Sequence, residues 1–301
     1  MEWEKEIHDF ETYLLLEKGL SRNTIEAYHR DIGKLADFCR QHESPVSPET
    51  VTPELLSEFL QSVSGENLCA RSQARLLSCI KTFYKFMIVE ENLETNPAQL
   101  LETPKIGTHL PDVLSVEEIV AIIDAASQHP KDGQRNRAII ETLYSSGVRV
   151  SELINMKLND LNLQDNYIKV HGKGNKERLV LLGRNAHEAL QTYIEGDRTR
   201  IPKIKEYKNF IFLCRSGKPL SRVRVYNIIQ ELIDQIGLSK RVSPHTFRHS
   251  FATHLVNGGA DIRLVQDMLG HESITTTEIY THIDNEYLRD TLVNCHPRGK
   301  K

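Results

Sequence analysis

Residues 243–259 read SPHTFRHSFATHLVNGG, a segment with helix-boundary signals at both ends. Ser243 is a favoured N-cap residue, and Pro244 suits the first helical position, where its missing N–H costs no hydrogen bond. Asn257 and the two glycines that follow it are typical of a helix C-terminus. The segment therefore predicts one helix with well-defined ends.

Two faces of this helix differ in character. Phe247, Phe251 and Leu255 recur every four residues, which predicts a stripe packed against a core. His245 and Arg248 lie three residues apart on another face, in the first turn, where free backbone N–H groups and the helix dipole favour an anion. The segment alone fits two interpretations: a site for phosphate, sulfate or carboxylate, or a capped helix with a solvated polar face.

The composition is typical of a soluble globular protein with room for two domains. Hydrophobic residues make up 39% and charged residues 26% of the 301 residues. No stretch approaches the ~18 consecutive apolar residues of a membrane span, and the acidic N-terminus MEWEKEIHDF does not resemble a signal peptide. The five scattered cysteines contain no CxxC pair, which predicts reduced thiols and a cytoplasmic location.

The charge is distributed unevenly along the chain. Residues 1–105 hold 11 basic and 18 acidic residues, whereas the remaining 196 residues hold 27 basic and 23 acidic ones. Neither balance is that of a strongly basic nucleic-acid binder. If DNA is the partner, the positive charge must therefore be concentrated on one surface.

The hydrophobic periodicity predicts a mainly α protein with a small β-hairpin or sheet. Four helical segments fill residues 1–105: one that begins its periodicity at Phe10, then Arg22–Cys39 after a Ser21 cap, Glu54–Val63 after a Thr52 cap, and residues 70–90. Residues 106–114 read as a linker, and Ser115 and Glu118 form a capping box that opens a second domain, 115–301.

The second domain reads as mixed α and β. Helices are predicted over Arg137–Tyr144, Val150–Met156 and most of the chain after Val223. Residues 167–182, YIKVHGKGNKERLVLL, predict a hairpin around a glycine-containing turn, and Phe210–Leu213 predicts a short strand.

Four further residues join His245 and Arg248 as candidates for chemistry. They are Arg149 in SGVRVSEL, Lys173 in GKGNKER, His271 in LGHESI and Tyr280 in TTTEIYTHI. Each alone has an ordinary structural explanation: a surface ion pair, a solvated turn, a buried histidine or a core tyrosine. The GKG string lacks the spacing of a phosphate-binding P-loop and does not precede a helix.

As a set, these six side chains suit phosphoryl transfer. Guanidinium groups match phosphate oxygens two at a time and stay charged. Charge in the transition state of such a reaction spreads over the nonbridging oxygens, which fixed cations stabilise. A tyrosine serves as a covalent nucleophile, and a lysine can protonate a leaving alkoxide.

The order and spacing of these motifs resemble the tyrosine recombinase (phage integrase) family, in particular its Xer branch. SGVRVSEL, HGKGNKERLV, PHTFRHSFATHL, LGHESITTTEIYTH and the N-terminal EKGLSRNTIEAYHRDI carry the resemblance, which runs from about residue 10 to about residue 290. It implies a SAM-like helical core-binding domain over 1–105 and an α+β catalytic domain over 115–301 that ends in an exchange segment.

The resemblance also implies a role for each candidate. Tyr280 is the nucleophile that forms a 3′-phosphotyrosyl link, Arg149 and Arg248 clamp the nonbridging oxygens, His245 aids proton transfer, Lys173 protonates the leaving oxygen, His271 hydrogen-bonds the phosphate, and Glu152 supports the site. No cofactor and no metal are implied.

Double-stranded DNA with a specific recombination site is the implied partner. The candidate DNA contacts in the first domain are Arg22, Asn23, Tyr28, Arg30, Arg71, Arg75, Lys81 and Lys85. In relatives the two domains close around DNA, and a homo- or hetero-tetramer on two sites works with a second Xer-like recombinase and a septal DNA translocase. These partners are not visible in the sequence, and no membrane insertion is expected.

Several alternatives remain at this point. The same chemistry serves the integrase or resolvase of a mobile element as well as Xer-type chromosome dimer resolution. A DNA-binding relative that no longer cuts is disfavoured by the intact set of six residues. A histidine-based metallohydrolase is a different class: His245, His249 and His254 cluster in sequence, but HExxH is absent.

Overall fold

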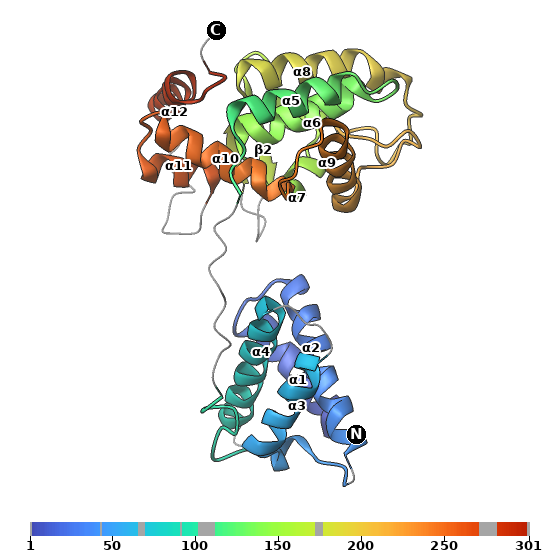
Figure 1. Ribbon diagram of the computed structural model, residues 1–301, viewed down its shortest axis with the longest axis vertical. Coiled ribbons are helices and arrows are strands. Elements are labelled where there is room, and N and C mark those ends of the chain that lie inside the picture. The colour runs from blue at the N-terminus through green and yellow to red at the C-terminus, as the bar shows by residue number, and fades with distance from the viewer. Residues whose placement is uncertain are drawn as a thin grey trace. The chain divides into compact units, whose positions relative to one another are not determined.

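The computed structural model describes residues 2–42, 44–65, 70–90, 92–101, 112–171, 177–270 and 282–299. The chain divides into two compact units, residues 1–109 and 110–301, and each unit has its own hydrophobic core. Figure 1 shows a helical N-terminal unit and a larger C-terminal unit that also contains strands. Within the described residues, no helix has the length and apolar character needed to cross a membrane.

The N-terminal unit is built from amphipathic helices around an aromatic core. Phe10, Phe83 and Phe86 are at most 2% exposed and contact one another with ring centroids 5.3 to 6.3 Å apart. The predicted caps are confirmed, because Ser21 Oγ accepts from the Thr24 N–H and Thr52 Oγ1 accepts from the Leu55 N–H, both at 3.3 Å. Its helices are α1 (Glu2–Leu16), α2 (Arg22–Gln41), η1 (Pro48–Thr50), α3 (Pro53–Gly65) and α4 (Ala70–Val89).

The first helix begins earlier than its predicted periodicity at Phe10. It starts at Glu2, and Trp3 and Ile7 extend the buried stripe toward the N-terminus. The acidic residues between these apolar positions weakened the periodic signal in the sequence. Burial against α2 and α4 compensates for them.

The C-terminal unit surrounds one central helix. Twelve of the fourteen residues of α6 are buried, and the helix packs against α5, α8 and α10. The capping box of Ser115 and Glu118 is confirmed at the start of α5. The helices of this unit are α5 (Val116–Ser127), α6 (Gly133–Ser146), α7 (Val150–Ile154), η2 (Leu158–Asp160), α8 (Arg184–Glu195), η4 (Asp197–Arg200), α9 (Arg222–Ile236), α10 (Pro244–Asn257), α11 (Ile262–Leu269) and α12 (His282–Cys295).

The described residues contain one antiparallel sheet with strand order β1-β2-β3. Its strands are β1 (Leu161–Asn162), β2 (Tyr167–His171) and β3 (Glu177–Leu181). The predicted hairpin is confirmed, with Tyr167 opposite Leu181 and His171 opposite Glu177. Its turn, residues 172–176, lies outside the described residues.

The predicted strand over Phe210–Leu213 is wrong. Phe210 forms an isolated bridge with Lys157, and Leu213 forms one with Pro219. The segment pairs with the chain after α7 on one side and with its own following turn on the other, so that no continuous ladder develops. The predicted helix over Val150–Met156 is also shorter than expected and ends at Ile154.

Candidate active site

The helix of the opening segment has the predicted boundaries, because α10 runs from Pro244 to Asn257. Phe247, Phe251 and Leu255 are at most 1% exposed, which confirms the core stripe. His245 and Arg248 differ in their surroundings. His245, the second residue of the helix, is exposed, whereas Arg248 is buried.

The guanidinium of Arg248 is held by main-chain carbonyls from two other parts of the chain. Nη1 donates to the Gly147 carbonyl at 2.6 Å, and Nη2 donates to the Leu269 carbonyl at 2.7 Å. Because a guanidinium has five N–H donors, these two bonds fix its position and leave donors for a ligand. Burial, and next the positive charge of Arg149, lower the pKa of Arg248 to about 10, so it remains a cation at neutral pH.

Arg149 reaches the same region from the end of α6. Gly147 turns the chain there with φ +59°, and a Cβ on it would lie 2.5 Å from the Phe251 ring, so the turn requires glycine. Arg149 is the N-cap residue of α7, and its Nη2 donates to the Gly270 carbonyl at 3.2 Å. Arg149 and Arg248 thus bind the carbonyls of two consecutive residues, 270 and 269.

Glu152 supports Arg149 as the sequence predicted. Its Oε2 accepts from the Arg149 backbone N–H at 2.8 Å, and its Oε1 accepts from Arg149 Nη1 at 3.1 Å. The Glu152 side chain is 2% exposed, whereas that of Arg149 is 37% exposed. The carboxylate therefore anchors the arginine from the protein side, and the other side of the guanidinium faces solvent.

The structure adds an arginine that the sequence reasoning missed. Arg178, on β3, donates from Nη1 to Glu152 Oε1 at 2.6 Å and from Nη2 to Glu152 Oε2 at 2.8 Å. This side chain is 12% exposed. Its position in the quoted motif HGKGNKERLV was the available signal, but an arginine on a half-buried strand has no distinctive local pattern.

The site is strongly cationic. Arg149 and Arg178 bind the single carboxylate of Glu152, and Arg248 is close enough to interact electrostatically with all three groups. Two positive charges are therefore uncompensated within this group. Burial alone would raise the pKa of Glu152, but its hydrogen bonds with Arg178 and Arg149 hold that pKa below its ordinary value. The carboxylate is therefore ionised at neutral pH, and the net field of the group favours an anion.

Three predicted catalytic residues lie outside the described residues: Lys173, His271 and Tyr280. Their roles stay predictions. In the sequence, His271 directly follows Gly270, whose carbonyl accepts from Arg149.

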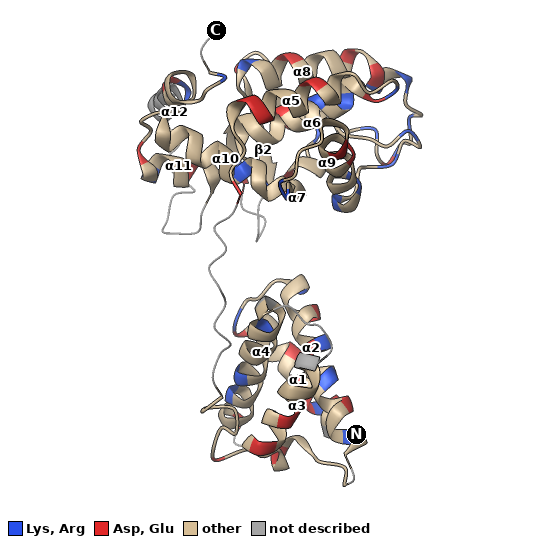
Figure 2. Cartoon of the chain, viewed as in Figure 1, with Lys and Arg blue, Asp and Glu red and all other residues tan. Residues whose placement is uncertain are grey.

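The predicted DNA-contacting residues of the N-terminal unit lie on α2 and α4. Helix α4 carries four basic residues and no acidic one, whereas α1 carries five acidic residues and one basic one (Figure 2). Lys81 and Lys85 line a surface groove of about 420 Å³ on α4 together with Ser78. The net negative charge of this unit is thus separated from its basic helix.

The other predicted DNA-contacting residues of this unit differ in how exposed they are to a ligand. Arg22, Asn23 and Arg30 are exposed on α2. Tyr28 is half-buried and stacks on Phe10, with ring centroids 6.4 Å apart, so its ring packs against the core and stays partly exposed. Arg75 forms an ion pair with Asp31 at 2.8 Å, which ties α4 to α2. The side chain of Arg71 lies outside the described part of the chain.

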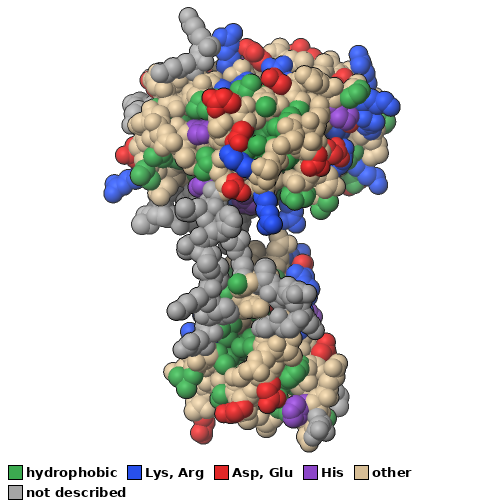
Figure 3. All heavy atoms as spheres, in the orientation of Figure 1, with side chains coloured by type: hydrophobic (Ala, Val, Ile, Leu, Met, Phe, Trp, Pro, Cys, Tyr) green, Lys and Arg blue, Asp and Glu red, His purple; other side chains and the backbone are tan. Residues whose placement is uncertain are grey.

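A second basic surface, which the sequence reasoning did not identify, follows α8. Residues 197–221 contain seven basic residues and two acidic ones, and most of the basic side chains are exposed (Figure 3). We call this segment the α8–α9 connection. It contains Arg198, Arg200, Lys203, Lys205, Lys208, Arg215 and Lys218.

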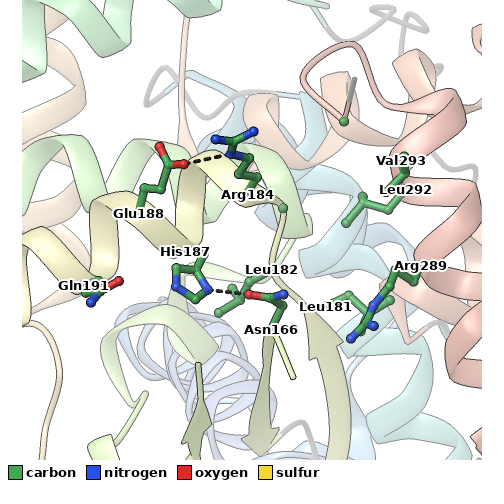
Figure 4. A pocket seen from close by; sticks show the side chains of 12 residues that line it. Asn166, Leu181, Leu182, Arg184, His187, Glu188, Gln191, Arg289, Leu292 and Val293 are labelled. Atoms are coloured by element: carbon green, nitrogen blue, oxygen red, sulfur yellow. Dashed lines mark hydrogen bonds and ion pairs between the residues drawn. The ribbon is translucent and has the colours of Figure 1, made fainter. Parts of the chain in front are cut away.

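A cavity of about 400 Å³ lies apart from the arginine cluster, between α8, the sheet and α12. Figure 4 shows His187 directed at Asn166, to which it is hydrogen-bonded, and Arg289 approaching from α12. Arg289 Nη2 donates to the Asp165 carbonyl at 2.7 Å. No predicted catalytic residue is among the described residues that line this cavity.

Across the described ranges, no group of three or more His, Cys, Asp or Glu side chains is arranged to hold a metal ion.

Comparison with known protein families identifies both units. The model of the phage integrase family matches residues 112–286, and the model of the phage integrase N-terminal SAM-like domain matches residues 7–91. The chain therefore belongs to the phage integrase family.

Individual relatives agree with this assignment. The tyrosine recombinase XerD of Chlorobaculum tepidum is 41% identical over 300 residues, which cover 99% of this chain and 98% of that protein. A solved XerH site-specific recombinase bound to a palindromic difH substrate is 26% identical, covers 88% of this chain and 78% of that chain, and has a TM-score of 0.68. The solved Tn1549 transposon integrase shares the fold, with a TM-score of 0.72 at 19% identity, over 93% of this chain and 98% of that one.

These matches support one activity, which is site-specific recombination of the Xer type by a tyrosine recombinase. They also bear out the mainly helical fold with its SAM-like first domain.

Proposed function

We propose that this protein cuts and rejoins double-stranded DNA through a 3′-phosphotyrosyl intermediate formed by Tyr280. The observation that carries the proposal is the convergence of Arg149 and Arg248, from two separate helices, on consecutive carbonyls. Each guanidinium is fixed by the protein and keeps unused donors, which is the arrangement needed to bind nonbridging phosphate oxygens as their charge increases.

The remaining steps use residues assigned by the sequence. Tyr280 attacks the scissile phosphorus, and the bond to the 5′ oxygen of the next nucleotide breaks. Lys173 gives a proton to that departing oxygen, while His245 aids proton transfer from the tyrosine and His271 binds the phosphate. The phosphotyrosyl bond conserves the energy of the broken phosphodiester, so that rejoining needs no cofactor.

We assign DNA binding to both units. Residues 1–105 form the core-binding domain, and its helix α4 presents Lys81 and Lys85 to the phosphate backbone. Residues 106–114 are the linker, and residues 115–301 form the catalytic domain, where the exposed α8–α9 connection adds positive charge. Contacts of this kind position the protein on DNA, and sequence recognition requires further contacts to base edges.

The biological role that we favour is the resolution of chromosome dimers. The relatives at about 40% identity are XerD recombinases that align over nearly the whole chain. In this role the protein acts in the cytoplasm as a homo- or hetero-tetramer on two sites, with a second Xer-like recombinase and a septal DNA translocase. The second candidate is a mobile-element integrase, because the Tn1549 integrase shares the fold.

Mapping covalent protein–DNA adducts across the host chromosome tests this role. Trapped complexes are purified under denaturing conditions, and the linked DNA is sequenced. Chromosome dimer resolution predicts one dominant site near the replication terminus. Adducts at the ends of mobile elements would instead establish the second candidate.

A further inference from the structure

Arg178 has no role in the steps above, yet it contacts the residues that hold the active site together. We propose that Arg178 is a positioning residue for strand cleavage: through its two-pronged pair with Glu152, it fixes Arg149 for phosphate binding. This inference rests on the proposed function.

The contacts form a chain that leads to the reacting phosphate. Glu152 Oε1 accepts from Arg178 Nη1 at 2.6 Å and from Arg149 Nη1 at 3.1 Å, while Oε2 accepts from Arg178 Nη2 and from the Arg149 backbone N–H, both at 2.8 Å. Because Arg178 binds both oxygens, it sets the rotation of the carboxylate plane. That rotation in turn sets the direction of the Arg149 guanidinium.

The three side chains of this chain of contacts are buried to different extents. The Glu152 side chain is 2% exposed and that of Arg178 is 12% exposed, whereas that of Arg149 is 37% exposed. Arg178 therefore approaches Glu152 from the protein interior and leaves the outer side of the cluster open. Arg149 can bind an anion on its solvent-exposed side, because Arg178 binds the Glu152 carboxylate on the buried side.

Arg178 also lies against the backbone that both phosphate-binding arginines contact. A Cβ on Gly270 would lie 3.0 Å from Arg178 Cδ and 3.1 Å from its Nε. The carbonyl of Gly270 accepts from Arg149, and the carbonyl of the preceding residue, Leu269, accepts from Arg248. The Arg178 side chain thus packs against the turn at Gly270 and also binds the carboxylate of Glu152.

Lysine cannot reproduce these contacts. Its single ammonium group lacks the planar fork that binds both oxygens of a carboxylate in parallel, although it supplies the same charge. If charge alone mattered, Arg178→Lys would behave as the wild type. If orientation matters, Arg178→Lys will retain folding and DNA binding but will cleave slowly.

The test compares Arg178→Lys and Arg178→Met with a matched control, Arg135→Met. Arg135 is another buried arginine of the same unit, paired with Asp132 at 3.1 Å, but it lies near the opposite end of α6 from Gly147. Full-length variants are mixed in excess with a nicked substrate that carries the recombination site and traps the covalent complex. The thermal unfolding temperature of each variant is measured first. The single-turnover rate and the DNA affinity are then measured at a temperature below the unfolding range of every variant.

We expect both Arg178 variants to form the adduct about 100-fold more slowly than the wild type, the size of loss that a misplaced binding group produces. Their DNA affinity should stay close to that of the wild type, and Arg135→Met should keep a wild-type rate even where it unfolds at a lower temperature. A second substrate carries sulfur in place of the bridging 5′ oxygen, and its leaving group can depart without being protonated by a general acid. The Arg178 variants should also cleave this sulfur substrate slowly, because their defect lies in phosphate binding.

Three results would overturn the inference. They are a wild-type rate for the Arg178 variants, an equal loss of rate in Arg135→Met, and recovery of Arg178→Met on the sulfur substrate. Failure of the wild-type protein to form any adduct would contradict the proposed function instead, and the two failures are thereby distinguished.

Discussion

In the proposed mechanism, Arg248 combines a structural and a catalytic task. It bridges the carbonyls of Gly147 and Leu269 and keeps donors for phosphate. Lysine cannot span both carbonyls from one nitrogen. Arg248→Lys should therefore slow single-turnover cleavage by at least ~100-fold while DNA binding persists. Arg263→Lys, an exposed change on α11, should have no effect. Equal rates for the two variants would show that Arg248 has no part in catalysis.

Lys173 offers a separate test of the proton-transfer step. A bridging sulfur leaves as a thiolate whose conjugate acid has a pKa near ~8.5, so it can leave unprotonated. Lys173→Ala should cleave ordinary DNA very poorly and regain much of its rate on the sulfur substrate. Arg248→Ala should gain less, because charge still builds on the nonbridging oxygens. If both variants gain equally, Lys173 binds phosphate and is not the acid.

At the level of single residues, the sequence predicted the site unevenly. Arg149 and Arg248 were found because each lies at a helix start within a recognisable motif. Arg178 was missed because its importance depends on a contact with Glu152, 26 positions away, that no local pattern records. Tyr28 was predicted to contact DNA from its place on the second helix and from the family resemblance; its ring also stacks on Phe10, a packing contact that the sequence did not indicate, and its DNA contact stays a prediction.

Among the elements, the end of α12 and the residues after it form an anchored C-terminal tail. His296 is 3% exposed and packs on the Tyr144 ring, with ring centroids 4.7 Å apart. Arg298 Nη2 donates to the buried Glu141 at 2.7 Å. A Cβ on Gly258 would lie 2.1 Å from the Cys295 carbonyl, so α10 and the tail meet closely. The tail therefore fixes the far end of the segment that follows Tyr280.

This anchor predicts a pH dependence of stability. Burial, and next the charge of His254, lower the pKa of His296 from 6.5 to about 4. Tyr144 and Arg298 also face this ring. The folded state thus binds fewer protons than the unfolded state between these values, and stability falls as the pH drops from 6.5 toward 4, by at most roughly 3 kcal/mol. Below about 4 this contribution changes no further.

Urea unfolding at several pH values measures this effect as a difference between variants. His296→Gln should show a weaker pH dependence than the wild type between pH 6.5 and 4, and His254, whose pKa burial also lowers, supplies part of the remainder. His245→Gln, which alters an exposed histidine, should keep the wild-type slope. Identical slopes for wild type and His296→Gln would contradict the role of His296.

Elements with strong periodicity and explicit caps were predicted well. Helix α2 begins after its Ser21 cap, and the β2–β3 hairpin has its expected position. The segment 210–213 was not, because its backbone hydrogen-bonds to Met156 after α7 and to its own following turn instead of to a continuous strand. Short apolar runs do not specify which partner will cover them.

For the whole molecule, the separation of charge matters more than its sum. The net charge is −3, but α4 in the first unit and the α8–α9 connection in the second are both basic, and these are the segments that we propose bind DNA phosphates. Total composition does not show this arrangement, because it depends on where the basic residues fall along the chain, in residues 70–89 and 197–221.

Reversing the charge on α4 tests this arrangement. The double variant Lys81→Glu/Lys85→Glu should bind DNA more weakly, and its plot of log affinity against log salt should be shallower by about one to two units, since each lost phosphate contact removes about 0.9. The matched variant Lys5→Glu/Lys18→Glu makes the same charge change on the acidic helix α1 and the turn that follows it. Equal weakening by both variants would show a general charge effect in place of a binding helix.

The central claim is that Tyr280 forms a covalent bond with a DNA phosphate and needs no metal to do so. The most direct measurement incubates the protein with its trapping substrate in excess EDTA, digests the complex and locates the linked nucleotide by mass spectrometry. We predict a 3′-phosphonucleotide on Tyr280, formed at the same rate with and without EDTA. A linkage to any other residue, or cleavage that stops in EDTA and returns with added metal, would contradict this account.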